Sequence, residues 1–306
     1  MSTQNHQDTP PICDYTDSDY QSTFWDTGGR RYEDAVEAIA LKRLLTKPGK
    51  LMLELGAGAG RNTPRYNMYE QIVLLDYSRT QLLQARERLG SNPNYRYVAA
   101  DIYKLPFVDA LFDGATMIRT LHHMADARQA LSEVHRVQTN GGVFVLEFAN
   151  KRNLKSILRY LLGRQKWSPF TTEQVEFVAL NFNFHPKTVR KLLAEVGYEL
   201  KDQLSVSHFR TGLLKRSLPH SLLVGADKLL QPTGRIWQVS PSIFTLSQAK
   251  NNAAASPGSF FQCPACHTSL PENDTSITCP GCQRIWQYED GIYDFRIQPP
   301  EKNADV

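Results

Sequence analysis

The sequence of 306 residues predicts an α/β protein built on a doubly wound parallel sheet. Two observations predict this class. Short apolar runs such as QIVLLD, residues 71–76, alternate with segments whose apolar residues have helical spacing. Nearly continuous apolar runs are typical of parallel strands covered on both faces, and repeated strand–helix alternation favours right-handed crossovers. The chain is long enough for one large domain and a second, small one.

The elements of the first half follow in order. Strands are predicted at residues 50–56, 71–76, 96–101, 112–121 and 143–148. Helices are predicted at residues 33–45, at 78–90 and from about residue 126. Ser78 and Gln81 form a capping box at the start of the second helix, and Gly90 suits its end. An Asn-Gly-Gly turn at 140–142 is expected before the fifth strand.

Beyond residue 151 the periodicity is weaker. Helices are predicted at 171–181 and 186–196, the second with Pro186 in its first turn and Gly197 at its end. Strands from residue 198 and at 236–239 are expected to close the sheet, with a leucine-rich helix between them. Residues 251–259 are small and polar, which is typical of a linker.

Charge is distributed unevenly along the chain. Between residues 151 and 250 there are 16 Lys+Arg and 6 Asp+Glu, a net charge of 16 − 6 = +10; the rest carries 19 and 25, or −6. Such a basic block is either a solvated surface or a face for an anionic substrate or a membrane surface. No apolar run is long enough for a membrane helix, and the polar N-terminus lacks the pattern of a signal peptide. A cytoplasmic location is expected.

Three glycines follow the first strand in LELGAGAG, and they narrow the choice of ligand. A dinucleotide fingerprint would need a third glycine where Arg61 stands, and no Gly-Lys-Ser/Thr is present to form a P-loop. Glu54 lies inside the preceding strand. A carboxylate there would repel a pyrophosphate but suits a ligand that carries an ammonium group.

The segments LELGAGAGR, LLDYS, AADIYKLPF, FDGATMIRTLHHMAD and LSEVHRVQTNGGVFVLEF occur in this order. In their order and spacing they resemble class I S-adenosylmethionine-dependent methyltransferases of type 11, from about Tyr32 to Phe148. The resemblance implies a Rossmann-like methyltransferase sheet and S-adenosylmethionine as cofactor. It also implies in-line methyl transfer, for which the enzyme mainly supplies orientation and desolvation.

The resemblance carries roles to single positions of this sequence. The glycines would let the backbone pass close to the methionine portion, Glu54 would orient its amino end, and Asp76 would accept both ribose hydroxyls. Tyr77 would lie against the adenine, which Asp101 and Ile102 would recognise. The expected cofactor-binding residues are Glu54, Gly56, Gly58, Gly60, Asp76, Tyr77, Asp101, Ile102 and Arg119.

Three of the candidate residues have alternatives that the sequence leaves open. Arg119 would line the methionine end or the substrate entrance, or would instead be a surface ion-pair partner. His123 is a candidate base, but the His122–His123 segment mostly shapes the loop over the cofactor in similar enzymes. Glu147 is a second candidate base, with a buried and fully hydrogen-bonded glutamate as its alternative.

Four cysteines lie close together near the C-terminus: Cys263, Cys266, Cys279 and Cys282. Two CxxC pairs separated by twelve residues can offer four thiolates to one tetrahedral, structural zinc ion. A redox CxxC usually occurs once, near a strand–helix unit. With the DGIYDF that follows, the module resembles zinc ribbons that partner or are fused to tRNA, rRNA and release-factor methyltransferases.

These features divide the chain into a leader at 1–28, a methyltransferase domain at 29–250, a linker at 251–259 and a zinc ribbon at 260–306 with its own core. Within the domain, 29–150 would hold the cofactor and 151–250 would close over the substrate.

The expected function is methyl transfer to a small-molecule acceptor that is aromatic, quinone-like or lipid-linked. One alternative is an RNA or protein methyltransferase whose basic region and ribbon position a macromolecule. A second is a non-catalytic binding module, against which the intact set of Glu54, Asp76 and Asp101 argues.

Overall fold

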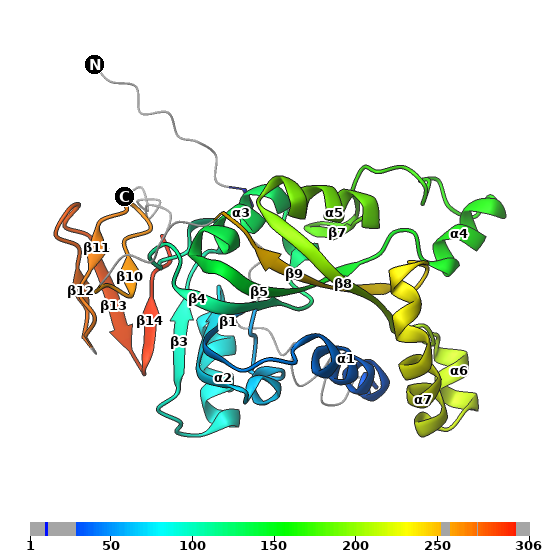
Figure 1. Ribbon diagram of the computed structural model, residues 1–306, viewed down its shortest axis with the longest axis horizontal. Helices are drawn as coiled ribbons and strands as arrows, with labels where there is room; N and C mark the ends of the chain where they lie inside the picture. Colours follow the sequence, from blue (N-terminus) through cyan, green and yellow to red (C-terminus); the bar gives the residue numbers. More distant parts are fainter. Residues whose placement is uncertain (1–9, 12–28, 252–257, 274, 298–306) are drawn as a thin grey trace, which may run out of the picture.

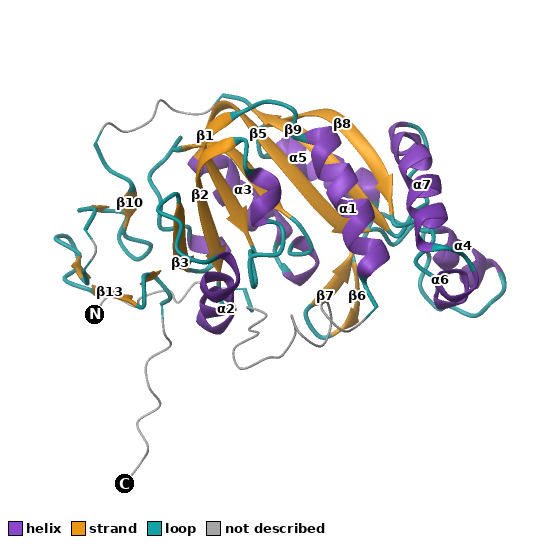
Figure 2. Cartoon of the chain, turned by 90° about the horizontal axis from the view of Figure 1, so that it is seen from below, coloured by secondary structure: helices purple, strands orange, loops and turns teal. Residues whose placement is uncertain are grey.

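The computed structural model describes residues 10–11, 29–251, 258–273 and 275–297. The predicted leader at 1–28 and linker at 251–259 therefore lie almost wholly outside the described residues. The fold centres on one sheet of ten strands in the order β12-β13-β14-β3-β2-β1-β4-β5-β9-β8 (Figure 1). Helices cover both faces of its central strands (Figure 2), so the predicted doubly wound α/β class is confirmed.

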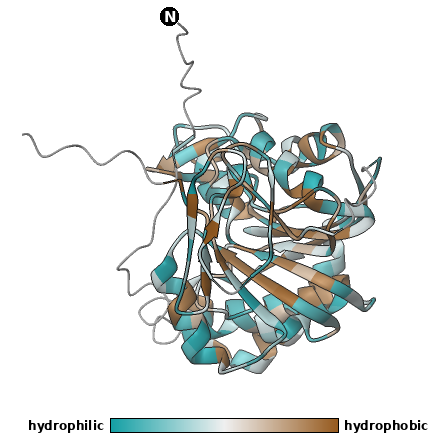
Figure 3. Cartoon of the chain, turned by 90° about the vertical axis from the view of Figure 1, so that its left-hand side faces the viewer, coloured by the Kyte–Doolittle hydropathy of each residue, from teal (hydrophilic) through white to brown (hydrophobic). Residues whose placement is uncertain are grey.

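Five parallel strands form the middle of the sheet, as predicted. They are β1 (Gly49–Leu55), β2 (Tyr69–Asp76), β3 (Tyr95–Ala99), β4 (Phe112–Met117) and β5 (Gln138–Ala149). Strand β5 begins before the expected turn at 140–142. Those residues form an irregularity within β5 instead, because Phe112 pairs with Gln138 and Gly114 already pairs with Val143. The central strands are predominantly hydrophobic (Figure 3), as burial on two faces requires.

The crossover helices of the first half begin and end close to the predicted residues. They are α1 (Arg31–Leu44), α2 (Arg79–Leu89) and α3 (Ala127–Val137). The Ser78 side chain accepts a hydrogen bond from the Gln81 backbone N–H at the start of α2, and Gly90 ends this helix with a φ of 70°. Asp126 caps α3 in the same way, accepting from Gln129 N. Local capping chemistry therefore sets these boundaries.

Two apolar clusters lie on opposite faces of the sheet. The first includes α3 and α5 (Pro186–Glu195), and the second includes α1, α2 and α7 (His220–Leu230). Short 3₁₀ turns connect further elements: η2 (Thr63–Tyr66), η3 (Ile102–Lys104), η4 (Leu121–His123) and η5 (Gln231–Arg235). Among the described helices, none combines the length and apolar character needed to cross a bilayer.

The antiparallel closing pair differs from the prediction in its second strand. β8 (Tyr198–Val206) forms as expected, but its partner β9 runs over Ser242–Ala249, between β5 and β8. The prediction of a strand at 236–239 is wrong. The chain there continues from η5 without forming a strand, and Ile236 and Trp237 are exposed. Ile243 and Phe244 of β9 are fully buried and supply the apolar face instead. Helices α6 (Gly212–Ser217) and α7 lie between the two strands in sequence.

The region between β5 and α5 also differs from the prediction. The segment 171–181, predicted as a helix, instead forms most of a hairpin of β6 (Val175–Val178) and β7 (Asn181–Asn183). Leu180 turns the chain with a φ of 53°, and its N–H donates to the Glu176 carboxylate over 2.8 Å. Helix α4 (Leu154–Leu161) was not predicted, whereas α5 and its ending at Gly197 were.

The C-terminal module joins the main sheet. It consists of β10 (Phe261–Gln262), β11 (Ser269–Leu270), β12 (Ile277–Thr278), β13 (Ile285–Glu289) and β14 (Ile292–Asp294). β14 pairs in parallel with β3, with Tyr293 opposite Val98. Phe260 and Phe261 belong to the same apolar cluster as Phe107. The expectation of a separate ribbon core is therefore wrong, because the aromatic residues that follow the linker pack on the sheet's own aromatic residues.

Candidate cofactor site and cysteine cluster

The glycine loop follows β1 at the carboxyl edge of the sheet. Gly56, Gly58 and Gly60 have φ values of 66°, 52° and 70°, a region that favours glycine. A Cβ on Gly56 would lie 2.1 Å from the Thr120 hydroxyl oxygen, and one on Gly60 would lie 2.8 Å from Leu89. A Cβ on Gly58 would meet only the Gln81 side chain, at 3.7 Å. Gly56 and Gly60 are thus required by contacts within the protein, whereas at Gly58 the positive φ, and not a close contact, favours glycine.

Asp76 fixes this loop to the next helix. Its carboxylate accepts hydrogen bonds from Gly58 N over 2.8 Å and from Ser78 N over 2.9 Å. Each carboxylate oxygen has a second lone pair, so the group can accept further hydrogen bonds from a ligand. Asp76 is only partly buried, which leaves it accessible at the edge of the sheet.

Asp101 and Ile102 lie after the neighbouring strand. The end of β3 is held beside that of β2 because Ala100 N donates to Asp76 O over 3.1 Å. The Asp101 carboxylate accepts from Tyr103 N over 2.9 Å and caps η3. Burial raises the pKa of Asp101. The structure therefore brings the three predicted positions Asp76, Asp101 and Ile102 to one edge.

Tyr77 contacts the C-terminal module. The Arg296 guanidinium carbon lies 5.8 Å from the centre of the Tyr77 ring, and Arg296 Nη1 donates to Tyr77 O over 3.5 Å. Asp294 holds the same guanidinium through its two carboxylate oxygens. The expected adenine face of the site is thus adjoined by residues from beyond the cysteine cluster, which the sequence did not indicate.

Glu54 is buried at the end of β1. The Thr63 hydroxyl donates to its carboxylate over 2.6 Å. Burial raises the pKa of Glu54 to about 7, although the Thr63 hydrogen bond and Arg61 lower it in part. A nearby ammonium group would stabilise the charged form of this carboxylate. Thr63, in the turn after the glycine loop, was missed, because a lone threonine has no distinctive signal.

Arg119 forms an ion pair with a buried partner and not with a surface one. Its Nε and Nη2 both donate to Glu37 Oε1, and Glu37 is fully buried. Arg61 Nη2 bonds the other oxygen of Glu37 over 2.9 Å. Burial alone would raise the pKa of Glu37, but Arg119 and Arg61 hold it below its ordinary value. The sequence prediction does not include the acidic residues of α1, although Glu33 and Glu37 are spaced to lie on one face of the helix.

Arg119 also has a φ of 57°, an unusual conformation for a residue with a side chain. Its backbone N–H donates to Glu147 Oε2 over 2.9 Å, and the Ser242 hydroxyl donates to Glu147 Oε1. Glu147 is buried, and burial raises its pKa. With a hydrogen bond to each oxygen, Glu147 matches the structural alternative better than a base.

The two histidines lie together in η4, with ring centres 4.0 Å apart. His123 Nδ1 is 3.2 Å from Leu180 O, so its N–H can donate there. Burial lowers the pKa of both His122 and His123, which keeps these rings neutral near pH 7.

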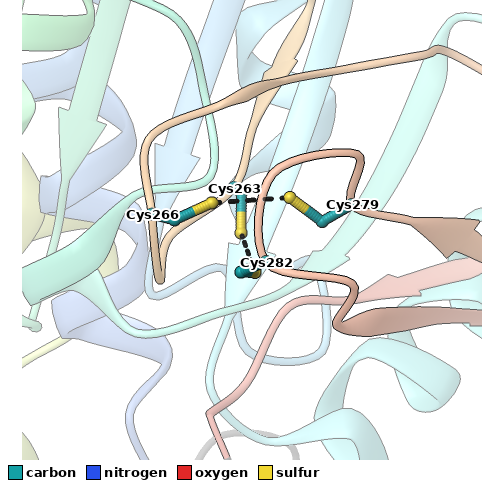
Figure 4. A group of neighbouring side chains, drawn as sticks. All are labelled: Cys263, Cys266, Cys279 and Cys282. Atoms are coloured by element: carbon teal, nitrogen blue, oxygen red, sulfur yellow. Dashed lines mark hydrogen bonds between the residues drawn. The ribbon is translucent and has the colours of Figure 1, made fainter.

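The four cysteines converge from two loops (Figure 4). Their sulfur atoms all lie within 4.8 Å of one another. Cys263 and Cys282 sulfurs are 3.8 Å apart, and those of Cys266 and Cys279 are 3.5 Å apart. A disulfide would need about 2.05 Å. Four thiolates around a tetrahedral zinc ion at about 2.3 Å would stand about 3.8 Å apart. The donor set and spacing fit such an ion.

Comparison with known proteins agrees with this geometry. A family model described as a methyltransferase domain matches residues 53–146. The chain is 30% identical over 181 residues to the ubiquinone/menaquinone biosynthesis C-methyltransferase UbiE of Pseudomonas syringae pv. syringae, covering 53% of this chain and 69% of that protein. It is 34% identical over 123 residues to the 2-phytyl-1,4-naphtoquinone methyltransferase of a Nostoc species, covering 38% and 54%. The chain thus spans about half to two thirds of these relatives.

Solved structures show the same fold at low identity. A Haloferax volcanii complex of the Trm112 methyltransferase activator with a putative methyltransferase matches with a TM-score of 0.54 and 16% identity, over 76% of this chain and 96% of that chain. A Thermotoga maritima methyltransferase matches with a TM-score of 0.51 and 21% identity, over 76% and 95%. A parallel sheet of this order, with Asp76 and Asp101 following neighbouring strands at its carboxyl edge, is that of a Rossmann-like α/β protein. The chain belongs to the class I S-adenosylmethionine-dependent methyltransferases.

Proposed function

We propose that this protein transfers a methyl group from S-adenosylmethionine to a small-molecule acceptor. The observation that carries the proposal is the carboxylate of Asp76, held against Gly58 at the edge of the sheet, with Asp101 just after the neighbouring strand β3. Membership of the methyltransferase family and the methyltransferase names of its relatives support it.

The residues present fit this cofactor. Asp76 would accept the ribose hydroxyls, and Asp101 would accept a hydrogen bond from the adenine amino group. A Cβ at Gly58 would meet the Gln81 side chain at 3.7 Å, so the loop stays slim there, and Glu54 would ionise beside the ammonium group. When bound, S-adenosylmethionine supplies a methyl group activated by its positive sulfur, so that an acceptor's electron pair bonds the methyl carbon and the C–S pair stays on sulfur.

For the acceptor we infer an aromatic, quinone-like ring in its reduced form. Two of the relatives are named for quinone methylation, and a reduced ring carries oxygen atoms that make its carbon nucleophilic. His123 is the better of the two candidate bases. With its Nδ1–H donating to Leu180 O, the lone pair of Nε2 would take up the proton that the ring carbon loses when the methyl group bonds to it, and burial keeps the imidazole neutral before that. Glu147 already accepts two hydrogen bonds from the protein.

We further propose that the cysteine cluster holds one structural zinc ion. Four thiolates fill a tetrahedral shell and leave no position for water or substrate, so this ion would not take part in methyl transfer. Four reduced thiols also suit a reducing compartment, and we infer a cytoplasmic location.

Calorimetry with S-adenosylhomocysteine tests the cofactor assignment. We expect wild-type binding and no binding of NAD. Asp76→Ala should lose about 1.5–3 kcal/mol for each hydrogen bond to the charged group, a factor of roughly ten or more in affinity. Asp113→Ala is the matched control, because Asp113 also accepts two backbone N–H groups, of Lys50 and Leu51, at the start of β1. Equal losses in both variants, or binding of NAD alone, would refute the assignment.

A methyl-transfer assay tests the acceptor class. Labelled S-adenosylmethionine is offered with reduced naphthoquinones and benzoquinones, and separately with bulk tRNA. We expect label in the quinones. Transfer to tRNA, with binding that weakens steeply as salt rises, would instead assign a nucleic-acid substrate.

A further inference from the structure

Helix α4 exposes an apolar face. Of its eight residues only Ser156 is buried. Leu154, Leu158 and Leu161 are 56%, 50% and 69% exposed, and their spacing places them on one side of the helix. A short helix is marginally stable in water and usually depends on packing of its apolar face. Within the described residues the apolar face of α4 lacks such packing. We therefore expect another surface to cover this face.

Other exposed apolar residues lie at the same end of the molecule. Ile236 and Trp237 are 77% and 71% exposed, and the segment after them joins α4 through the hydrogen bond from Leu154 N to Val239 O. Figures 1 and 2 place α4, α6 and α7 together at the end opposite the cysteine module. We call the following residues the apolar end: Leu154, Leu158, Leu161, Leu162, Ile236 and Trp237.

The charges around α4 are all positive. Lys155, Arg159, Arg164 and Lys166 are exposed, and residues 154–166 contain no acidic residue. None of these four side chains forms an ion pair with any residue that the structure describes. Leucines that alternate with cations on one short helix are typical of segments that lie in the headgroup region of an anionic membrane. An indole ring such as that of Trp237 also favours this region.

We propose that the apolar end docks this protein on the surface of an anionic lipid membrane. The leucines of α4 insert at the boundary of headgroups and acyl chains, and the four cations contact lipid phosphates. The helix projects from the body of the molecule (Figure 1), which suits a flat surface better than a groove in a protein. The proposal is independent of the methyl acceptor.

The position of α4 gives this docking a consequence for the site. α4 follows directly on the carboxyl end of β5, where Glu147 contacts the backbone of Arg119. The cofactor residues lie at the same edge of the sheet. Docking through α4 therefore holds that edge near the bilayer. The site would then bind an acceptor that is dissolved in the lipid.

Sedimentation with vesicles tests the proposal on the full chain. The vesicles are of phosphatidylcholine alone or with one third phosphatidylglycerol. We expect binding to the anionic vesicles only, weakened by salt. The double variant Leu158→Ser/Leu161→Ser should bind at least tenfold more weakly, since each leucine loses its burial in lipid. Arg159→Gln/Arg164→Gln should lose roughly fivefold per cation.

Ile285→Ser is the matched control. Ile285 is 57% exposed at the other end of the molecule, beside Arg284, so its loss should leave vesicle binding unchanged. Thermal unfolding checks that all variants are folded. Absence of binding to anionic vesicles would overturn the proposal, as would equal binding by the leucine variant. A wild-type dimer that the leucine substitutions dissociate would also overturn it, because the face would then join two copies of the chain.

Discussion

The apolar residues at the two ends of the ten-stranded sheet differ in how far they are buried. At the end formed by the C-terminal module, next to β3, Phe260, Phe261 and Phe295 are buried in a cluster shared with the central strands. Beyond β8, at the other end, Leu161 and Trp237 remain 69% and 71% exposed. Both ends carry large apolar side chains. Those beyond β8 are exposed because no element of the described chain covers them.

The junction between the C-terminal module and β3 also has polar contacts. Phe295 N donates to Ala99 O over 2.8 Å, which continues the pairing of β14 with β3. Arg79, in the first turn of α2, pairs with Asp290 over 2.7 Å and with Glu289 over 2.9 Å. The module therefore caps an edge strand that would otherwise present unpaired backbone groups to solvent.

The largest effect is expected at the cysteine cluster. Cys279→Ser removes one of four metal ligands, and zinc binding contributes about 10–16 kcal/mol to the folding of small zinc peptides. Because the module shares a core with the sheet, we expect zinc loss together with a lower unfolding midpoint for the whole protein, by roughly 10 °C or more.

Elemental analysis and a thermal scan measure the two effects. Cys13→Ser is the control, since Cys13 stands outside the paired CxxC pattern and should retain zinc. An unchanged midpoint in a zinc-free Cys279→Ser protein would show that the two parts are stable independently, and the comparison of the two ends would then fail.

A pair of apolar truncations measures the contrast directly. Phe261 is fully buried, and its ring centre lies 4.8 Å from that of Tyr293 and 4.9 Å from that of Phe295. Phe261→Ala should therefore destabilise the protein by about 3–5 kcal/mol. Leu161→Ala at the exposed end should change the free energy of unfolding by no more than about 0.5 kcal/mol. Urea denaturation measures both, and similar losses in the two variants would contradict the difference between the ends.

Local signals explain what could be predicted from the sequence. The capping side chain of Ser78 and the terminal Gly90 are encoded within a few residues, so α2 was placed correctly. Asp76 and Asp101 could be placed at one edge because they follow apolar strands, and parallel strands align their carboxyl ends.

Two features that the sequence did not indicate depend on contacts between distant parts of the chain. The pairing of Tyr293 with Val98 and the ion pair of Arg119 with Glu37 join segments far apart in sequence, which no local pattern specifies. The helix prediction at 171–181 is wrong for a local reason, because spacing alone does not separate a short hairpin from a helix.

The smallest expected effect concerns Arg296, where the C-terminal module contacts the expected adenine side of the site. Its guanidinium lies over the Tyr77 ring at 5.8 Å and is held by Asp294. A contact of this kind at a partly exposed position contributes about 0.5–1 kcal/mol. If Tyr77 supports the adenine, Arg296→Ala should weaken binding of S-adenosylhomocysteine about twofold to fivefold, measured by calorimetry, with an unchanged unfolding midpoint. Arg284→Ala is the control, because Arg284 is an exposed cation of the same module that lies over Trp286 and not over Tyr77. Equal affinities of the two variants would limit the module to a structural role, since its side chains would then stabilise the sheet edge without affecting the ligand beside it.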